Sequence, residues 1–295
     1  MCRILTSIAF VLLLFATAAN AGYWVSNFKD SASRYRIIRE SETISIEQLM
    51  LLHAGDTVII DDPHGQIILV DESNKHRTLT AENSPFVVAD SSSPPRLLIN
   101  VRDWVASWWN TRGNQSTSTM AAVSRGGLEP EIKGATSGMN FLLSGRRDLH
   151  IAWGGGLPPF DVRLMSESGN LMGHLAGIAD YAISLPQVEL QDGQRYFLHV
   201  ASGDAKGVMD VTALGTEQLP KPAAAILNLD APDEVRFGYL AMLLSTQWQW
   251  RFEALQLAHE YDLSRLELDL LAGGFPESGI TESSSIPDLL DTDQH

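Results

Sequence analysis

The chain has 295 residues, of which 44% are hydrophobic and 19% are charged, a composition typical of globular rather than disordered or fibrous proteins. Its formal net charge is −15 at pH 7. A surface this acidic repels phosphate backbones, which argues against nucleic acid as a partner. The length leaves room for two or three small domains of about 100–150 residues each.

Residues 1–21 have the pattern of a secretory signal peptide. Arg3 gives the positively charged start, Ile4 to Ala18 is an apolar run, and Ala19-Asn20-Ala21 is a small-x-small cleavage site. The apolar run is shorter than the ~20 residues that a membrane-spanning helix needs. We therefore expect cleavage near Ala21 and no transmembrane segment in the mature chain. An uncleaved N-terminal anchor is the alternative.

Cys2 is the only cysteine, and it lies inside the predicted signal peptide. The mature chain is then expected to have no thiol and no disulfide. Export without disulfides argues against a small disulfide-stapled extracellular fold and favours the bacterial periplasm, or secretion from a bacterium. It also excludes thiolate catalysis from the mature chain.

Residues 22–110 are predicted to form a small β domain followed by an amphipathic helix. Short segments rich in β-branched and aromatic residues alternate with turn sequences. The predicted strands are Thr57 to Asp61, Gln66 to Asp71, Arg77 to Thr80 and Pro85 to Ala89. A helix is expected to start at Arg96, with an apolar stripe formed by Leu97, Val101, Trp104, Val105 and Trp108. The stripe favours packing within the protein, and a docking helix for a partner is the alternative.

Two stretches in this region, Gly55-Asp56-Thr57-Val58 and Gly65-Gln66-Ile67-Ile68-Leu69-Val70-Asp71, resemble the FecR-like β domain of exported bacterial proteins. The likeness covers about residues 49–90. The chain departs from the pattern after Asp71, where Glu72-Ser73-Asn74 replaces the usual glycine. The resemblance implies a structural or signal-relay β module rather than an enzyme.

Residues 111–137 are rich in glycine, serine and threonine and are predicted to be a flexible linker. From 138 to 216, apolar and polar residues alternate with period two between turn sequences. This pattern predicts an antiparallel β-sandwich, so the expected fold class is mainly β with some α. The alternation places His150 and His199 at outward positions, where we expect them to face solvent.

The stretch Trp153-Gly154-Gly155-Gly156-Leu157-Pro158-Pro159-Phe160-Asp161-Val162 is similar to the start of immunoglobulin-like modules in bacterial surface and periplasmic proteins. A second similar stretch is Asp192-Gly193-Gln194-Arg195-Tyr196-Phe197-Leu198-His199-Val200. The match covers about residues 140–214 and implies an Ig-like sandwich. Tyr196 stands where the tyrosine-corner residue would be. Leu198 replaces the disulfide cysteine, so the domain is not of the antibody type. Such sandwiches have many functions, so the resemblance implies none.

Residues 226–274 are predicted to form three short amphipathic helices. Thr246-x-x-Gln249 and Ser264-x-x-Glu267 match capping boxes for the second and third of these helices. Residues 275–295 form an acidic, serine-rich tail that is expected to be disordered.

No catalytic motif is present: the sequence has no Gly-x-Ser-x-Gly, no phosphate-binding glycine loop, no His-Glu-x-x-His and no Cys-x-x-Cys. His53, His64 and His76 could meet a metal together with Asp61 or Asp62, but their spacing matches no known ligand pattern. Surface histidines are therefore favoured. We predict no enzyme, no catalytic residue, no cofactor and no metal.

The sequence therefore favours a non-enzymatic, exported, modular protein for protein–protein interaction, scaffolding or signal relay in the bacterial cell envelope, with another envelope protein as partner. The helical segment is the expected partner surface, with Trp248, Trp250 and Phe252 as anchors if they are exposed. One alternative is a carbohydrate- or cell-wall-binding module with Trp153 and Tyr181 as its platform. Another is a hydrolase whose site is assembled from residues far apart in the sequence.

Overall fold

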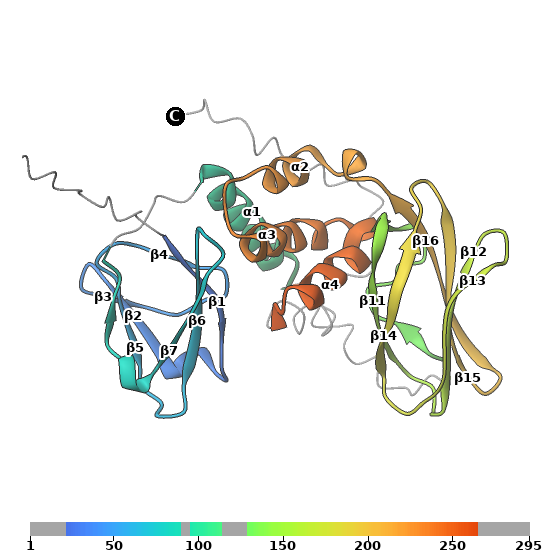
Figure 1. Cartoon of the computed structure of the whole chain (residues 1–295), viewed down its shortest axis with the longest axis horizontal. Helices are drawn as coiled ribbons and strands as arrows, with labels where there is room; N and C mark the ends of the chain where they lie inside the picture. The colour runs from blue at the N-terminus through green and yellow to red at the C-terminus, as the bar shows by residue number, and fades with distance from the viewer. Residues whose placement is uncertain (1–21, 90–94, 114–128, 265–295) are drawn as a thin grey trace, which may run out of the picture.

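In a computed structural model that describes residues 22–89, 95–113 and 129–264, strands dominate and short helices accompany them, which confirms the predicted fold class. Two β-sandwiches stand at opposite ends of the molecule, and a layer of helices lies between them (Figure 1). The predicted signal peptide and acidic tail lie outside the described residues. None of the described helices has the length and hydropathy needed for a membrane span.

The N-terminal sandwich consists of two four-stranded sheets with strand orders β4-β1-β6-β7 and β3-β2-β5-β8. Its strands are β1 (Tyr23–Phe28), β2 (Tyr35–Arg39), β3 (Glu42–Ile44), β4 (Leu51–Leu52), β5 (Thr57–Ile60), β6 (Gln66–Asp71), β7 (His76–Thr80) and β8 (Phe86–Val87). The four strands predicted from the sequence correspond to β5 through β8. The strands β1 to β4 were not predicted. In β1 a register shift between Val25 and Asn27 breaks the period-two alternation, and β3 and β4 have only three and two residues.

The pair Gly55-Asp56, which precedes β5, has a structural role. Gly55 adopts a left-handed φ of +86°, which favours glycine. The buried Asp56 carboxylate accepts hydrogen bonds from Arg39 Nε (2.9 Å), from Arg39 Nη2 (2.6 Å) and from the amide of His53 (2.7 Å). Because a buried carboxylate must be paired, this motif holds together the turn that leads into β5.

The C-terminal sandwich packs a five-stranded sheet, ordered β10-β16-β15-β12-β13, against a three-stranded sheet, ordered β14-β11-β9. Its strands are β9 (Glu131–Ile132), β10 (Asn140–Leu143), β11 (Gly145–Gly154), β12 (Phe160–Ser166), β13 (Leu171–Ile178), β14 (Ala182–Leu190), β15 (Arg195–Ser202) and β16 (Ala205–Leu214). All pairings are antiparallel except β10 with β16. The sandwich begins earlier than predicted, since β9 lies within the range expected to be a linker and pairs with β11.

The core of this sandwich is formed by the inward positions of the alternating strands, including Phe160, Val162, Leu164, Leu198 and Val200. Tyr196 is also buried, and its hydroxyl accepts a hydrogen bond of 2.8 Å from the backbone amide of Gln191. A tyrosine corner requires a contact of this kind, from the tyrosine hydroxyl to the backbone a few residues upstream. Membership of the Ig-like class stays a prediction.

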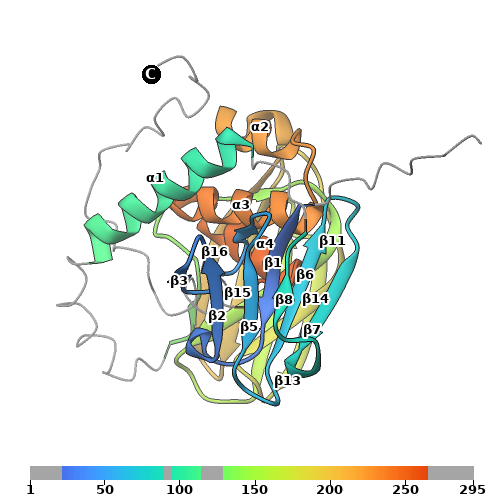
Figure 2. The ribbon, with the colours of Figure 1, turned by 90° about the vertical axis from the view of Figure 1, so that its left-hand side faces the viewer.

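The helical layer is composed of α1 (Arg96–Gly113), α2 (Lys221–Leu227), α3 (Asp233–Ser245) and α4 (Arg251–Glu260). Viewed from the N-terminal sandwich, α1 and α2 rise above the strands (Figure 2). Trp24 and Val70 of the N-terminal sandwich belong to the core of this layer, and Phe141 and Leu214 of the C-terminal sandwich pack against the same core. One apolar cluster therefore joins all three parts.

The segment predicted to be helical from residue 226 begins at Lys221, and its internal boundaries also differ from those expected. The proposed capping box at Thr246-x-x-Gln249 is wrong, because Thr246 is the C-cap of α3 and donates its hydroxyl to the Leu243 carbonyl at 2.6 Å. The next α-helix starts only at Arg251. The helix predicted after Ser264 lies outside the described residues.

Candidate functional site

Two of the three aromatic residues expected to anchor a partner are buried. Trp248 is 40% exposed, whereas Trp250 is 5% and Phe252 1% exposed. The ring of Trp250 meets Phe141 of β10 edge-on, with ring centroids 5.3 Å apart, and Phe252 belongs to the core of the C-terminal sandwich. Trp250 and Phe252 thus face the strands and belong to the interior. Only Trp248 remains available to a partner.

The two residues expected to form a glycan platform also separate. Trp153 is buried, and its ring meets Phe160 edge-on at 5.1 Å. Tyr181 is 45% exposed and contacts the same phenylalanine at 5.1 Å. A buried indole presents no face to a sugar, so Trp153 is excluded as a platform residue and Tyr181 alone is accessible.

A buried ion pair joins α4 to the C-terminal sandwich. The side chain of Glu253 is fully buried and accepts hydrogen bonds from Arg147 Nη1 at 2.8 and 3.1 Å and from the Leu143 amide at 3.1 Å. Arg147 Nη2 also reaches Glu260 at 3.0 Å. Burial would lower the pKa of Arg147, but the carboxylate of Glu253 outweighs it and raises that pKa. Burial raises the pKa of Glu253, and the guanidinium of Arg147 opposes this rise.

A second contact of α4 involves His150, which was expected to face solvent. Gln256 binds the backbone of His150 at both its amide and its carbonyl, each at 2.8 Å. The ring of His259 stacks on that of His150, with centroids 3.7 Å apart and an interplanar angle of 13°. Burial, and then the nearby His259, lowers the pKa of His150 to about 4. The expectation of exposure was wrong because α4 covers this strand. His199, on β15, is half-buried.

The other end of the helical layer is joined to the N-terminal sandwich through Glu234, near the start of α3. Its carboxylate accepts a hydrogen bond from the hydroxyl of Ser26 and lies 3.0 Å from Nε2 of His76. A nucleophilic triad needs its histidine between the serine and the acid. Here the acid lies between them, so His76 is not placed to take the proton of Ser26. This cluster is a joint rather than a catalytic site.

Within 22–89, 95–113 and 129–264, no group of three or more His, Cys, Asp or Glu side chains is placed to hold a metal ion. Of the three histidines considered as ligands, His76 contacts Glu234, whereas the amide of His64 donates to Asp62 and the amide of His53 donates to Asp56.

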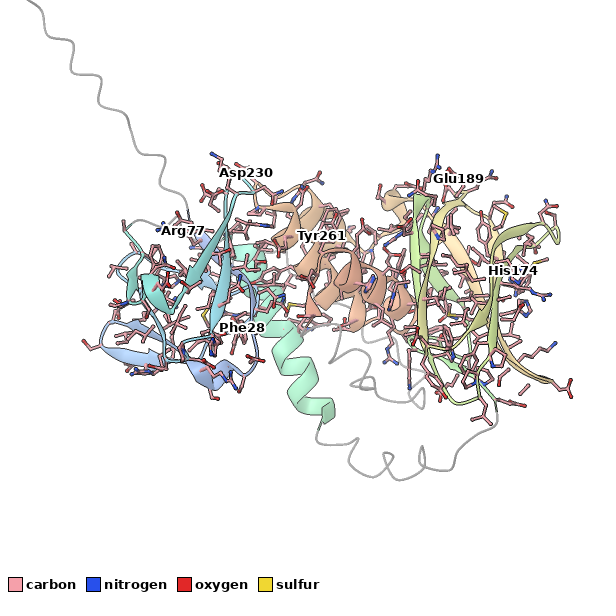
Figure 3. All side chains as sticks on the ribbon, turned by 60° about the horizontal axis from the view of Figure 1, so that its bottom comes forward. Phe28, Arg77, His174, Glu189, Asp230 and Tyr261 are labelled. Carbon is pink, nitrogen blue, oxygen red and sulfur yellow. The ribbon has the colours of Figure 1, made fainter. Side chains whose placement is uncertain are left out.

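The exposed apolar residues of the C-terminal sandwich include Leu171 (56% exposed) and Leu175 (37%) on β13, the outer strand of the five-stranded sheet. We call residues 171–178 the β13 edge. In the ladder, Leu175 is opposite the fully buried Val162, so both point to the inner face of the sheet. The side chain of Leu175 nevertheless stays partly accessible, with 37% of its surface exposed. His174 marks this edge at the end of the molecule farthest from the N-terminal sandwich (Figure 3).

The β13 edge differs from β14, the outer strand of the opposing sheet. β14 contains Pro186, which has no amide hydrogen to donate, and Glu189, and Gln187 within it has a left-handed φ of 53°. Prolines, charges and irregular backbone are the usual protection of free strand edges. The β13 edge contains no proline and no acidic, lysine or arginine residue, and only His174 can carry a charge. It shares irregular backbone with β14, because two bulges limit its regular ladder to Gly173–Ala176.

Comparisons with known proteins assign no family, since no family model and no curated protein matches the chain. Among solved structures, the chain is similar to one described as "Biofilm associated protein - BSP domain", with 12% sequence identity and a TM-score of 0.24. The similarity covers 69% of this chain and 26% of the other, so the chain spans about a quarter of that protein's length. A TM-score of 0.24 is too low to assign this chain the fold or the role of that protein.

Proposed function

We propose that the protein is a non-enzymatic interaction or scaffolding protein, exported to the bacterial cell envelope, that binds a protein partner through the β13 edge. The observation that carries the proposal is the outer strand of the five-stranded sheet, which is apolar, nearly uncharged and without a strand partner on one side within the described residues. This surface replaces the helical segment, whose aromatic residues are largely buried.

An edge of this kind has a definite chemical preference. The backbone amides and carbonyls that point away from β12 are free to pair with an added strand, and side chains at alternate positions then determine specificity. Leu175 on the inner face and Leu171 would both be covered by such a strand. Burying apolar surface is the main favourable term in protein association.

The helical layer holds the two sandwiches at a fixed separation, which bears on the proposed scaffolding role. Because Glu234 is bound to the N-terminal sandwich and Glu253 to the C-terminal one, the β13 edge is held at a fixed distance from the N-terminal sandwich. A rigid spacing of two surfaces suits a scaffold. The FecR-like resemblance of the N-terminal sandwich adds signal relay as a finer version of the same proposal.

The proposal is tested by introducing a photo-crosslinking amino acid at Leu175 in cells that export the protein, with Ser184 of β14 as the matched control. Both positions are exposed, and each lies on an outer strand. We expect adducts from position 175 and none from position 184, and we expect Leu175→Lys to abolish binding of the partner. Absence of adducts at position 175 would contradict the proposal.

A carbohydrate- or cell-wall-binding role is the second candidate, and the exposure of Tyr181 favours it. The neighbouring Leu157 is also exposed, and the Tyr181 hydroxyl donates to the Gly156 carbonyl at 3.4 Å. Sedimentation of the protein with purified peptidoglycan, lost in Tyr181→Ala and retained in Leu175→Lys, would favour this candidate. Retention of the protein in the supernatant would exclude it.

A further inference from the structure

We infer that the partner of the β13 edge is a second copy of this chain, and that the two β13 strands pair antiparallel about a two-fold axis at Leu175. The inference rests on the proposed function, because it names the partner of the same surface. The two five-stranded sheets would then form one continuous sheet.

The regular part of the β13 edge limits the registers in which two copies can pair. The regular part of the ladder is the short stretch Gly173–Ala176 between two bulges. In antiparallel pairs, directly opposed residues point to the same face of the sheet. A two-fold axis must therefore pass through a residue position, either His174 or Leu175, within the centre of this stretch. Each choice determines all the other cross-strand neighbours.

The charges beside the edge distinguish the two registers. On the outer face, β12 places Arg163 next to His174 and Asp161 next to Ala176. With the axis at His174, one row across the dimer would contain Arg163 and His174 of both copies, so that cationic groups face each other. With the axis at Leu175, His174 lies opposite the small Ala176 of the second copy, and the row ends at the Asp161 of that copy.

The second register is therefore self-complementary in charge. Each row joins an arginine and a histidine of one copy to an aspartate of the other. Asp161 already accepts hydrogen bonds from Arg163 at 2.6 Å and from His174 at 2.9 Å within one copy, and all three side chains are partly exposed. Like charges placed opposite each other destabilise a strand pair, whereas opposite charges stabilise it. A partner strand with only acidic side chains would face a like charge at Asp161, and one with only basic side chains would face a like charge at Arg163 and His174.

The same register also covers the inward-facing leucine. Leu175 of one copy would lie against Leu175 of the other at the rim of the two cores, where it is 37% exposed in a single copy. The pairing thus adds apolar contact to a side chain that the sandwich itself covers only in part.

The experiment is sedimentation equilibrium of the full chain carrying Cys2→Ser, at loading concentrations from about 1 to about 200 µM, a range chosen for a weak interface of small area. We expect a monomer–dimer equilibrium that Leu175→Lys shifts to monomer. The matched control Ser184→Lys, an exposed position on β14, should leave the equilibrium unchanged. A chain that stays monomeric throughout this range would overturn the inference.

The register is tested separately by cysteine cross-linking under mild oxidation. Directly opposed residues have Cα atoms about 4.5–5.5 Å apart, within the range that a disulfide spans. Leu175→Cys in the Cys2→Ser background should therefore give a covalent dimer, whereas Ser184→Cys should not. Equal dimer from both variants, or none from Leu175→Cys, would overturn the register.

Failure of this inference is distinguishable from failure of the proposed function. A monomeric chain that still gives photo-adducts at position 175, with a mass other than twice that of the chain, would refute the second copy and leave a different protein partner. A monomeric chain that gives no adduct at that position would refute both.

Discussion

The joint between α4 and the C-terminal sandwich predicts the largest single-residue effect on stability. The change is Glu253→Gln, which keeps the size of the side chain and removes its charge. In the unchanged chain the buried carboxylate accepts hydrogen bonds from Arg147 and from the Leu143 amide. The glutamine amide is neutral and has one acceptor oxygen instead of two. The mostly buried guanidinium of Arg147 therefore loses its closest counter-charge.

Removing one partner of a buried pair costs about 3–5 kcal/mol, because the other charge stays desolvated. Arg147 keeps its contact with the half-exposed Glu260, so we expect a loss near the lower end, about 3 kcal/mol. The assay is urea denaturation followed by tryptophan fluorescence, with the free energy of unfolding obtained by linear extrapolation.

The matched control is Asp61→Asn, which removes one partner of the exposed pair between Arg36 and Asp61. Exposed pairs contribute little because solvent screens them, so this variant should keep a urea midpoint close to that of the unchanged chain. A midpoint for Glu253→Gln that coincides with that of the control would refute the reasoning that this pair joins helix and sandwich.

Three further changes test other parts of the structure. Because the pKa of His150 is lowered in the folded chain, the unfolded chain binds more protons between pH 6.5 and about 4, and stability should fall as the pH drops through this window. His150→Phe should flatten the dependence of the urea midpoint on pH, and an unchanged slope would contradict this. Asp56→Asn should lower the free energy of unfolding by about 2–3 kcal/mol, because Arg39 and the His53 amide lose a buried carboxylate. A urea midpoint equal to that of Asp61→Asn would contradict this expectation. Gly207→Ala should cost about 1–3 kcal/mol, because the added Cβ would overlap the carbonyl oxygen of Pro130, and unaltered thermal melting would disprove that close approach.

The sequence predicts the sandwich strands best where side chains alternate without interruption. Phe160, Val162 and Leu164 on β12 are examples, and all three are buried as the alternation requires. In β11 the alternation places Leu149 and Ile151 in the core correctly, and it places His150 on the other face. Alternation along one strand does not show which element covers that other face, so the contact of Arg147 and His150 with α4 could not be predicted.

The candidate site was missed for a different reason. β13 contains apolar residues interrupted by Gly173 and Gly177, and glycine in a run of this kind suggests a loop rather than a strand. An apolar edge is also visible only when the pairing of the strands is known. Conversely, Trp250 and Phe252 have the composition of a binding surface, and only the packing of α4 and the turn before it on the strands of the C-terminal sandwich shows that they belong to the interior.

The central claim is that the helical layer holds the two sandwiches as one rigid body. Spin labels attached through Glu42→Cys on β3 and Val208→Cys on β16, in the Cys2→Ser background, would report the separation of two exposed positions on different sandwiches. To exclude distances between copies, the labelled chain is mixed with an excess of unlabelled chain. A pulsed electron–electron resonance experiment should give one narrow distance distribution. A broad distribution would show that the sandwiches move independently and would contradict the account.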